Sequence, residues 1–115
     1  MDEPIYPAWS GEAARIRKQL APAPLAGFKA FSANVFADGA LTRKAKELIA
    51  IAVAHVTQCP YCIRGHTASA LKSGATEEEI MEAIWVAAEM RAGAAYAHST
   101  LAIETMRATR ERTEE

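Results

Sequence analysis

The sequence predicts an all-α fold of about six helices, and three observations support this class. Half of the 115 residues are hydrophobic but only 7% are aromatic, which favours closely packed helices over a β-sandwich. Alanine, the best helix former, is abundant. Apolar residues also recur at intervals of three and four, the spacing of amphipathic helices. At this length a single domain is expected over residues 1–115.

The first third of the chain should contain two helices after an irregular arm. The arm covers about residues 1–11 and contains proline and glycine. A short helix is expected over residues 12–20, where Pro22 and Pro24 end it. A second helix is predicted over residues 25–37, because its apolar residues have helical spacing.

The middle of the chain should form a buried central helix from Arg43 to Gln58, with Thr42 as its N-cap. The apolar run Leu48–Val56 inside it could also be a buried strand, but the length of the segment, which has neither Gly nor Pro, favours a helix.

Two further helix starts can be predicted from capping patterns. Pro60 suits the first position of a helix, so a helix should begin there with Cys59 as its cap and stop at Gly74. Thr76 and Glu79 have the spacing of a capping box and should open the next helix.

The C-terminal part is predicted to contain a break and a tail. Gly93 is expected to interrupt or kink the helix that follows Thr76, so that a last helix carries Tyr96 to Met106. The highly charged residues 110–115 are expected to form a solvated tail.

Charge and hydropathy argue against several classes of partner. Thirteen basic and fourteen acidic residues give a net charge of −1, so neither nucleic acid nor anionic lipid is an expected partner. The start has no signal-peptide pattern, and the apolar run Leu48–Val56 is far shorter than the roughly 20 residues that span a bilayer. We expect a cytoplasmic protein with no membrane segment, no bound cofactor and no resident metal.

The two cysteines of the chain form one Cys-x-x-Cys, Cys59 and Cys62. Residues three apart share a helix face at a separation that a disulfide can close, and a helix N-terminus favours the thiolate. In a reducing compartment such a pair is more often catalytic, redox-sensing or metal-binding than a permanent cross-link. It could also be half of a zinc site shared between subunits, or a buried apolar pair.

His66 and Glu47 are the candidate proton carriers near this pair. His66 lies one helical turn past Cys62, so it could act as a base or stabilise a thiolate, or it could be an ordinary exposed residue. Glu47 lies on the preceding helix, and sequence spacing alone does not bring it to the cysteines. Its carboxylate could simply be favoured by the helix dipole.

Taken together, Glu47, Cys59, Cys62 and His66 resemble the alkylhydroperoxidase AhpD group of the carboxymuconolactone decarboxylase-like family. The resemblance covers roughly residues 40–95. The segments that carry it are Lys46–Ala50, the CPYC motif at 59–62, Gly65–Thr67 and Gly74–Ile80.

This resemblance implies a helical bundle whose subunit core is completed by homo-oligomerisation, as a trimer or a hexamer. It implies that Cys62 is the peroxidatic nucleophile, that Cys59 resolves the sulfenic acid, and that Glu47 and His66 form a proton relay. The implied substrate is a hydroperoxide. The implied reductant is a dithiol on a lipoyl-bearing or thioredoxin-like protein.

The sequence is also compatible with several alternatives. In thioredoxin-like sites the first cysteine attacks, which would reverse the roles of Cys59 and Cys62. The chain is shorter than AhpD proper and has Tyr61 where AhpD can carry a second histidine. Lactone decarboxylation is not expected, because the decarboxylases generally lack the cysteine pair. Other candidate functions are a redox-sensing oligomer without turnover and metal binding by Cys59, Cys62 and His66.

Overall fold

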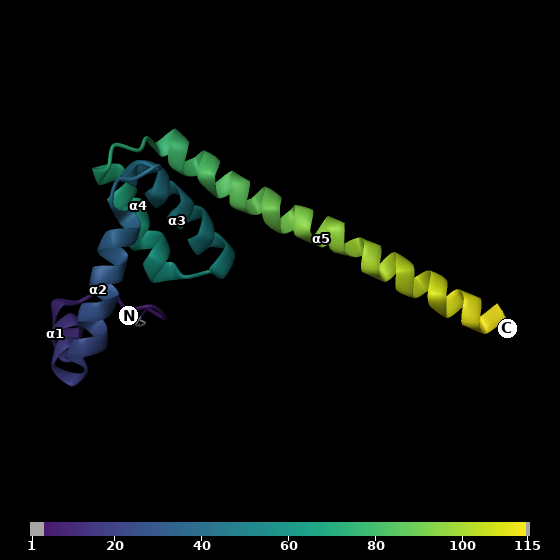
Figure 1. Ribbon diagram of the computed structural model, residues 1–115, viewed down its shortest axis with the longest axis horizontal. Coiled ribbons are helices and arrows are strands. Elements are labelled where there is room, and N and C mark those ends of the chain that lie inside the picture. Colours follow the sequence, from purple (N-terminus) through teal and green to yellow (C-terminus); the bar gives the residue numbers. More distant parts are fainter. Residues whose placement is uncertain (1–3, 115) are drawn as a thin grey trace.

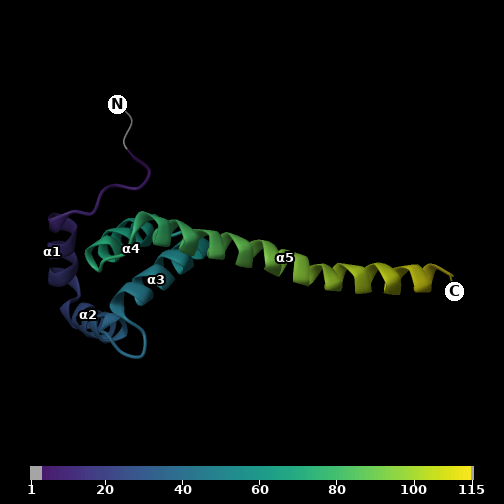
Figure 2. The same cartoon turned by 90° about the horizontal axis from the view of Figure 1, so that it is seen from above.

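A computed structural model describes residues 4–114, and all of its regular elements are helices. They are α1 (Gly11–Leu20), α2 (Pro22–Phe36), α3 (Arg43–Thr57), α4 (Pro60–Lys72) and α5 (Glu77–Glu114). Helices α1 to α4 gather at one end of the molecule, and α5 runs out from them as one long rod (Figures 1 and 2). The predicted all-α class is confirmed, and the run Leu48–Val56 is helical rather than a strand.

The N-terminal region differs from prediction in where the second helix begins. Residues 4–10 form no helix, while residues 1–3 of the predicted arm lie outside the described range. α1 ends at Leu20 as expected, but α2 already begins at Pro22. Pro22 and Pro24 lie in its first turn, where backbone amide hydrogens have no acceptor within the helix. The amide hydrogen that proline lacks is therefore not needed there. The break between the helices is therefore Ala21 alone.

The link between α3 and α4 is short and follows the predicted pattern. The Thr42 hydroxyl accepts the Ala45 amide at 3.1 Å and caps α3. Gln58 takes a left-handed backbone conformation, with φ 56°, and ends the helix. Cys59 is then the N-cap of α4 and Pro60 its first residue, so this predicted start is confirmed. With only two linking residues, α4 folds back to pack on α3.

The connection from α4 to α5 is also built as the sequence indicates. Gly74 has φ 93°, a conformation that glycine adopts without steric cost. The Ala75 amide donates to the Ala70 carbonyl at 2.9 Å, which completes a Schellman motif. Thr76 and Glu79 then exchange hydrogen bonds of 2.9 and 3.1 Å, so the capping box is confirmed.

The buried core lies where α3, α4 and the start of α5 meet. Ile51 and Ala70 are completely buried, and Ala75 and Ile80 adjoin them. The core is small because most other large apolar side chains of the described range remain partly exposed.

The prediction that Gly93 interrupts the helix and that a separate last helix follows was wrong. α5 continues through it to Glu114, so the expected separate helix around Tyr96–Met106 is part of α5 and there are five helices rather than six within residues 4–114. A glycine costs only about 1 kcal/mol in a helix, and the alanines on both sides are the best helix formers. Residues 110–114 are exposed and still helical, and Glu115 lies outside the described range.

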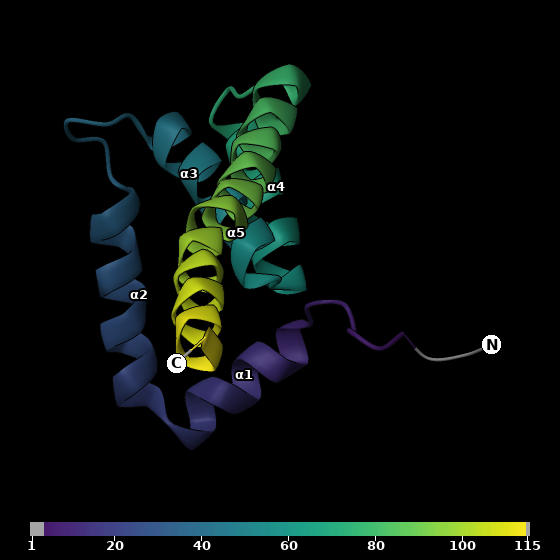
Figure 3. The same ribbon diagram turned by 90° about the vertical axis from the view of Figure 1, so that its right-hand side faces the viewer.

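The length of α5 makes the single chain elongated. Its radius of gyration is 20.8 Å, whereas a compact chain of this length has about 13 Å. Figure 3 looks along α5. α1 packs against α2, and α2 also packs against α3, but within the described residues neither of them packs against α5. Large apolar side chains therefore stay exposed along α5, among them Trp85, Met90, Tyr96, Leu101 and Met106.

Two isoleucines two residues apart on α3 test the position of the core. Ile51 is fully buried, and Ile49 is 50% exposed. Ile51→Ala should lower the free energy of unfolding by about 2–5 kcal/mol, because it removes methyl groups from the core and leaves a cavity. Ile49→Ala should cost about 1 kcal/mol or less. Urea unfolding of both variants measures the difference, and equal losses would contradict this core.

An exposed ion pair joins α3 to the start of α5. Lys44 Nζ lies 2.8 Å from Glu79 Oε2. The hydrogen bond from Lys44, and then that from the Thr76 amide, hold the pKa of Glu79 below its usual 4.5. A lowered pKa stabilises the folded state above the pKa of the unfolded chain, and this stabilisation is lost as the pH falls through the folded-state value.

Lys44→Gln should therefore raise the pKa of Glu79 and reduce the loss of stability on acidification. Carboxyl-carbon NMR titration measures the pKa directly. The control Lys29→Gln, an exposed lysine on α2, should leave it unchanged. A Glu79 titration identical in Lys44→Gln and wild type would show that the ion pair does not form in solution.

Candidate active site

Cys59 and Cys62 are joined by a disulfide at the N-terminus of α4. Their Cα atoms are 5.2 Å apart, within the usual range for a disulfide. The Cys59 sulfur also accepts a hydrogen bond from the Cys62 amide at 3.2 Å, so it caps the helix. The bond is thus closed between a cap residue and the first turn of one helix.

Glu47 and His66 meet across the packed surface between α3 and α4. The Glu47 side chain is 3% exposed, and its Oε2 lies 2.7 Å from His66 Nδ1. A carboxylate with so little contact with water needs a partner inside the protein, and His66 provides it. The structure therefore brings together two predicted site residues whose sequence spacing gave no reason to expect contact.

This hydrogen bond also fixes the role of each imidazole nitrogen. When Nδ1 donates to the Glu47 carboxylate, Nε2 is left to exchange a proton with another molecule. Arg43 adds little to the pair, because its Nε lies 4.0 Å from Glu47 Oε1 and its side chain is 59% exposed. The aromatic ring of Phe36 stacks on the His66 ring at 5.1 Å between centroids and limits its movement.

An apolar cavity of about 360 Å³ lies beside these groups. Cys62 and His66 both line it, whereas Cys59 does not. Its other walls come from α2 and α3, and the apolar contributors are Val35, Phe36, Ile49, Ala50, Val53 and Ala54. A small apolar molecule in this cavity would reach the Cys62 sulfur and the imidazole together.

His66 lies one turn after Cys62 on α4, but no hydrogen bond joins their side chains within residues 4–114. The two share a cavity wall instead, so a molecule bound there would lie between them. Within the same residues, no three His, Cys, Asp or Glu side chains group as a metal site, and no helix is long and apolar enough to cross a membrane.

Phe36 and Arg43 belong to the site but were not predicted from the sequence. In the sequence, Phe36 is one of several apolar residues of an amphipathic helix, and Arg43 is a residue in the first turn of the next helix. Nothing in their spacing relates them to His66 or Glu47, because both contacts depend on how the helices pack.

Comparison with known proteins assigns most of the chain to one family. A model of the carboxymuconolactone decarboxylase family matches residues 22–105. A protein of the cox locus of Paracoccus denitrificans is 66% identical over 79 residues, which are 69% of this chain and 71% of that protein.

Solved structures show the same relationship. A carboxymuconolactone decarboxylase family protein from Legionella pneumophila is 40% identical, with a TM-score of 0.64 over 69% of this chain and 70% of that chain. A family protein from Thermotoga maritima, for which a part in an antioxidative response has been suggested, is 26% identical, with a TM-score of 0.54 over 72% of this chain and 95% of that chain.

Proposed function

Because the chain belongs to the carboxymuconolactone decarboxylase family, as its motif indicated, we propose that it is a thiol-dependent peroxidase or disulfide oxidoreductase of the AhpD type. The observation that carries the proposal is that Cys62 and His66 line one apolar cavity while Glu47 holds the imidazole. The antioxidative role suggested for the Thermotoga relative points the same way.

In the first step of the proposed reaction the reduced Cys62 attacks a hydroperoxide. Its thiolate forms a bond to the outer oxygen, the O–O bond breaks, and the alcohol leaves with a proton from protonated His66. Cys62 becomes a sulfenic acid. Cys62 has this role rather than Cys59 because its side chain lines the cavity.

In the second step Cys59 resolves the sulfenic acid. The Cys59 sulfur bonds to the Cys62 sulfur and loses its proton, and the hydroxyl group leaves as water. Both electrons used to reduce the hydroperoxide come from the two thiols, and the product is the disulfide seen in the structure. A dithiol donor, such as a lipoyl group or a thioredoxin-like protein, then returns two electrons and two protons and is itself oxidised to a disulfide.

Glu47 and His66 would supply the protons for these steps. His66 Nε2 takes the proton from the attacking thiol and passes it to the leaving oxygen, while Glu47 stabilises the imidazolium that forms in between. A buried carboxylate suits this role, because little water competes for its hydrogen bond.

We also propose that the single domain works as a homo-oligomer in the cytoplasm, as a trimer or a hexamer. The small core and the exposed apolar side chains of α5, such as Trp85 and Tyr96, support association. A reducing compartment suits a cysteine pair that must be returned to its thiol form.

Cysteine variants test the order of attack. With a stoichiometric hydroperoxide, Cys62→Ser should leave Cys59 as a thiol and abolish turnover. Cys59→Ser should instead accumulate a sulfenic acid on Cys62, which a dimedone label and mass spectrometry detect. The reverse labelling would assign the attack to Cys59. Formation of the disulfide without any turnover by dithiol donors would favour a redox sensor over an enzyme.

Glu47→Gln and His66→Gln test the proton relay. Each should slow the oxidation of Cys62 by roughly 10²–10⁴-fold, the usual contribution of general acid–base catalysis. His55→Gln is the matched control, because its Nδ1 bonds only the Ile51 carbonyl of its own helix within residues 4–114. Stopped-flow measurement of oxidation follows the rate, and circular dichroism checks folding. Full rates in both site variants would remove the relay from the mechanism.

A further inference from the structure

Three adjoining cavities follow one another beside α3 and α4. The apolar cavity shares Phe36 and His66 with a middle cavity of about 370 Å³, which Glu47 also lines. The middle cavity shares Arg43 and Ser69 with a third cavity of about 750 Å³. The row therefore starts beside Cys62, passes the Glu47–His66 pair and ends near the beginning of α3 and the end of α4.

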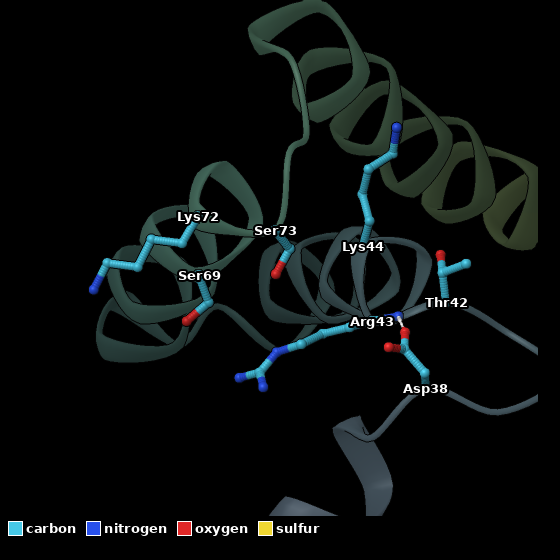
Figure 4. A pocket seen from close by; sticks show the side chains of 7 residues that line it. All are labelled: Asp38, Thr42, Arg43, Lys44, Ser69, Lys72 and Ser73. Atoms are coloured by element: carbon cyan, nitrogen blue, oxygen red, sulfur yellow. Dashed lines mark hydrogen bonds between the residues drawn. The ribbon is translucent and has the colours of Figure 1, made fainter.

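The third cavity, called here the basic cavity, has an unusual set of side chains (Figure 4). Three basic residues and one acidic residue line it, together with three hydroxyl groups. These residues are Asp38, Thr42, Arg43, Lys44, Ser69, Lys72 and Ser73. The proposed reaction gives none of its cations a role.

Two of the basic side chains remain available to a ligand. Lys44 is paired with Glu79. The Asp38 carboxylate accepts the Arg43 backbone amide at 2.7 Å. Within residues 4–114 Lys72 forms no ion pair, and the guanidinium of Arg43 has only the 4.0 Å contact with Glu47.

The spacing of residues along α4 relates the basic cavity to Cys62. Cys62, His66 and Ser69 follow at intervals of four and three residues, so they lie along one face of α4. Ser73, four residues further on, is the C-cap of this helix. At 1.5 Å per residue, Ser69 is about 10 Å along the helix from Cys62, and Ser73 is about 16 Å from it. A ligand that spans this distance could touch both ends of the row.

We propose that the basic cavity binds the anionic group, a carboxylate or a phosphate, of the molecule that reacts with Cys62. Arg43 and Lys72 supply the positive charge, and the hydroxyls of Ser69 and Ser73 donate hydrogen bonds. A guanidinium matches the two oxygens of either group, and such charged hydrogen bonds are strong. The reacting partner rests on the proposed function, whereas the anion site does not.

Two kinds of molecule carry such a group at this distance from their reacting atoms. One is a hydroperoxide with a carboxylate or phosphate end, whose apolar part would occupy the apolar cavity. The other is a dithiol reductant with an anionic end, which reaches the disulfide after oxidation. Both molecules would bind the basic cavity through their anionic group. They can be distinguished because the hydroperoxide reacts with the reduced protein and the dithiol with the oxidised protein.

The first experiment measures the anion site without any turnover. Inorganic phosphate is titrated at constant ionic strength, and backbone amide NMR follows Ser69 and Ser73. Saturable shifts at these residues are expected, with binding roughly tenfold weaker in Lys72→Gln. The control Lys18→Gln, an exposed lysine on α1, should bind like wild type. Absence of saturable shifts, or equal weakening in both variants, would overturn the site.

The second experiment identifies the source of the anion. Reduction of the disulfide is compared with dihydrolipoate and the neutral dihydrolipoamide, and oxidation of the thiols with a carboxylated alkyl hydroperoxide and its methyl ester. We expect the charged compound of one pair to react roughly tenfold faster than its neutral counterpart. Lys72→Gln should lose this preference, and Lys18→Gln should keep it. Phosphate binding with no preference in either half-reaction would overturn the assigned ligand. If no hydroperoxide oxidises the thiols but phosphate binds and dihydrolipoate is preferred, the peroxidase proposal fails and the anion site stands.

Discussion

The hydrogen bond between Glu47 and His66 determines how the two central helices face each other. A carboxylate withdrawn from water in this way must be paired within the protein, so α4 has to turn its His66 face toward α3. The same face carries Cys62 one turn earlier and Ser69 one turn later. One polar contact therefore aligns the sulfur, the imidazole and the row of cavities.

The site and the long helix occupy separate parts of the chain. The three cavities of the row are lined by α2, α3, α4 and the loop before α3, whereas the apolar side chains on the outer part of α5 project beyond them. Burial of those side chains against another surface would add to the stability that the small core provides.

Local chemistry made much of the fold predictable. The caps at Thr42 and Cys59, the capping box at Thr76 and the glycine stop at Gly74 each depend on neighbouring residues, and all are found in the structure. The errors came from residues that usually break helices but here do not. Pro22 lies in the first turn of α2, where its missing amide hydrogen costs little. Gly93 lies among alanines, whose high helix propensity outweighs the low propensity of one glycine.

The candidate site was predictable only in part, for a different reason. Cys59, Cys62 and His66 lie within one stretch of helix, so their spacing describes their geometry. Glu47 could be added only through family resemblance, because its contact with His66 depends on the packing of α3 on α4. Phe36 and Arg43 had neither a motif nor a period that related them to the site. Contacts between helices are set by packing across the whole surface, and no short pattern encodes them.

The position of Cys59 as the helix cap has a consequence for redox equilibrium. Its sulfur accepts the Cys62 amide while it is part of the disulfide. A thiolate at the same place would accept that hydrogen bond more strongly and would meet the positive end of the α4 dipole. The fold therefore stabilises the reduced form relative to the disulfide. Stabilising a reduced form raises the reduction potential, so the fold shifts this couple toward the oxidising side and makes its disulfide easier for a donor thiol to reduce.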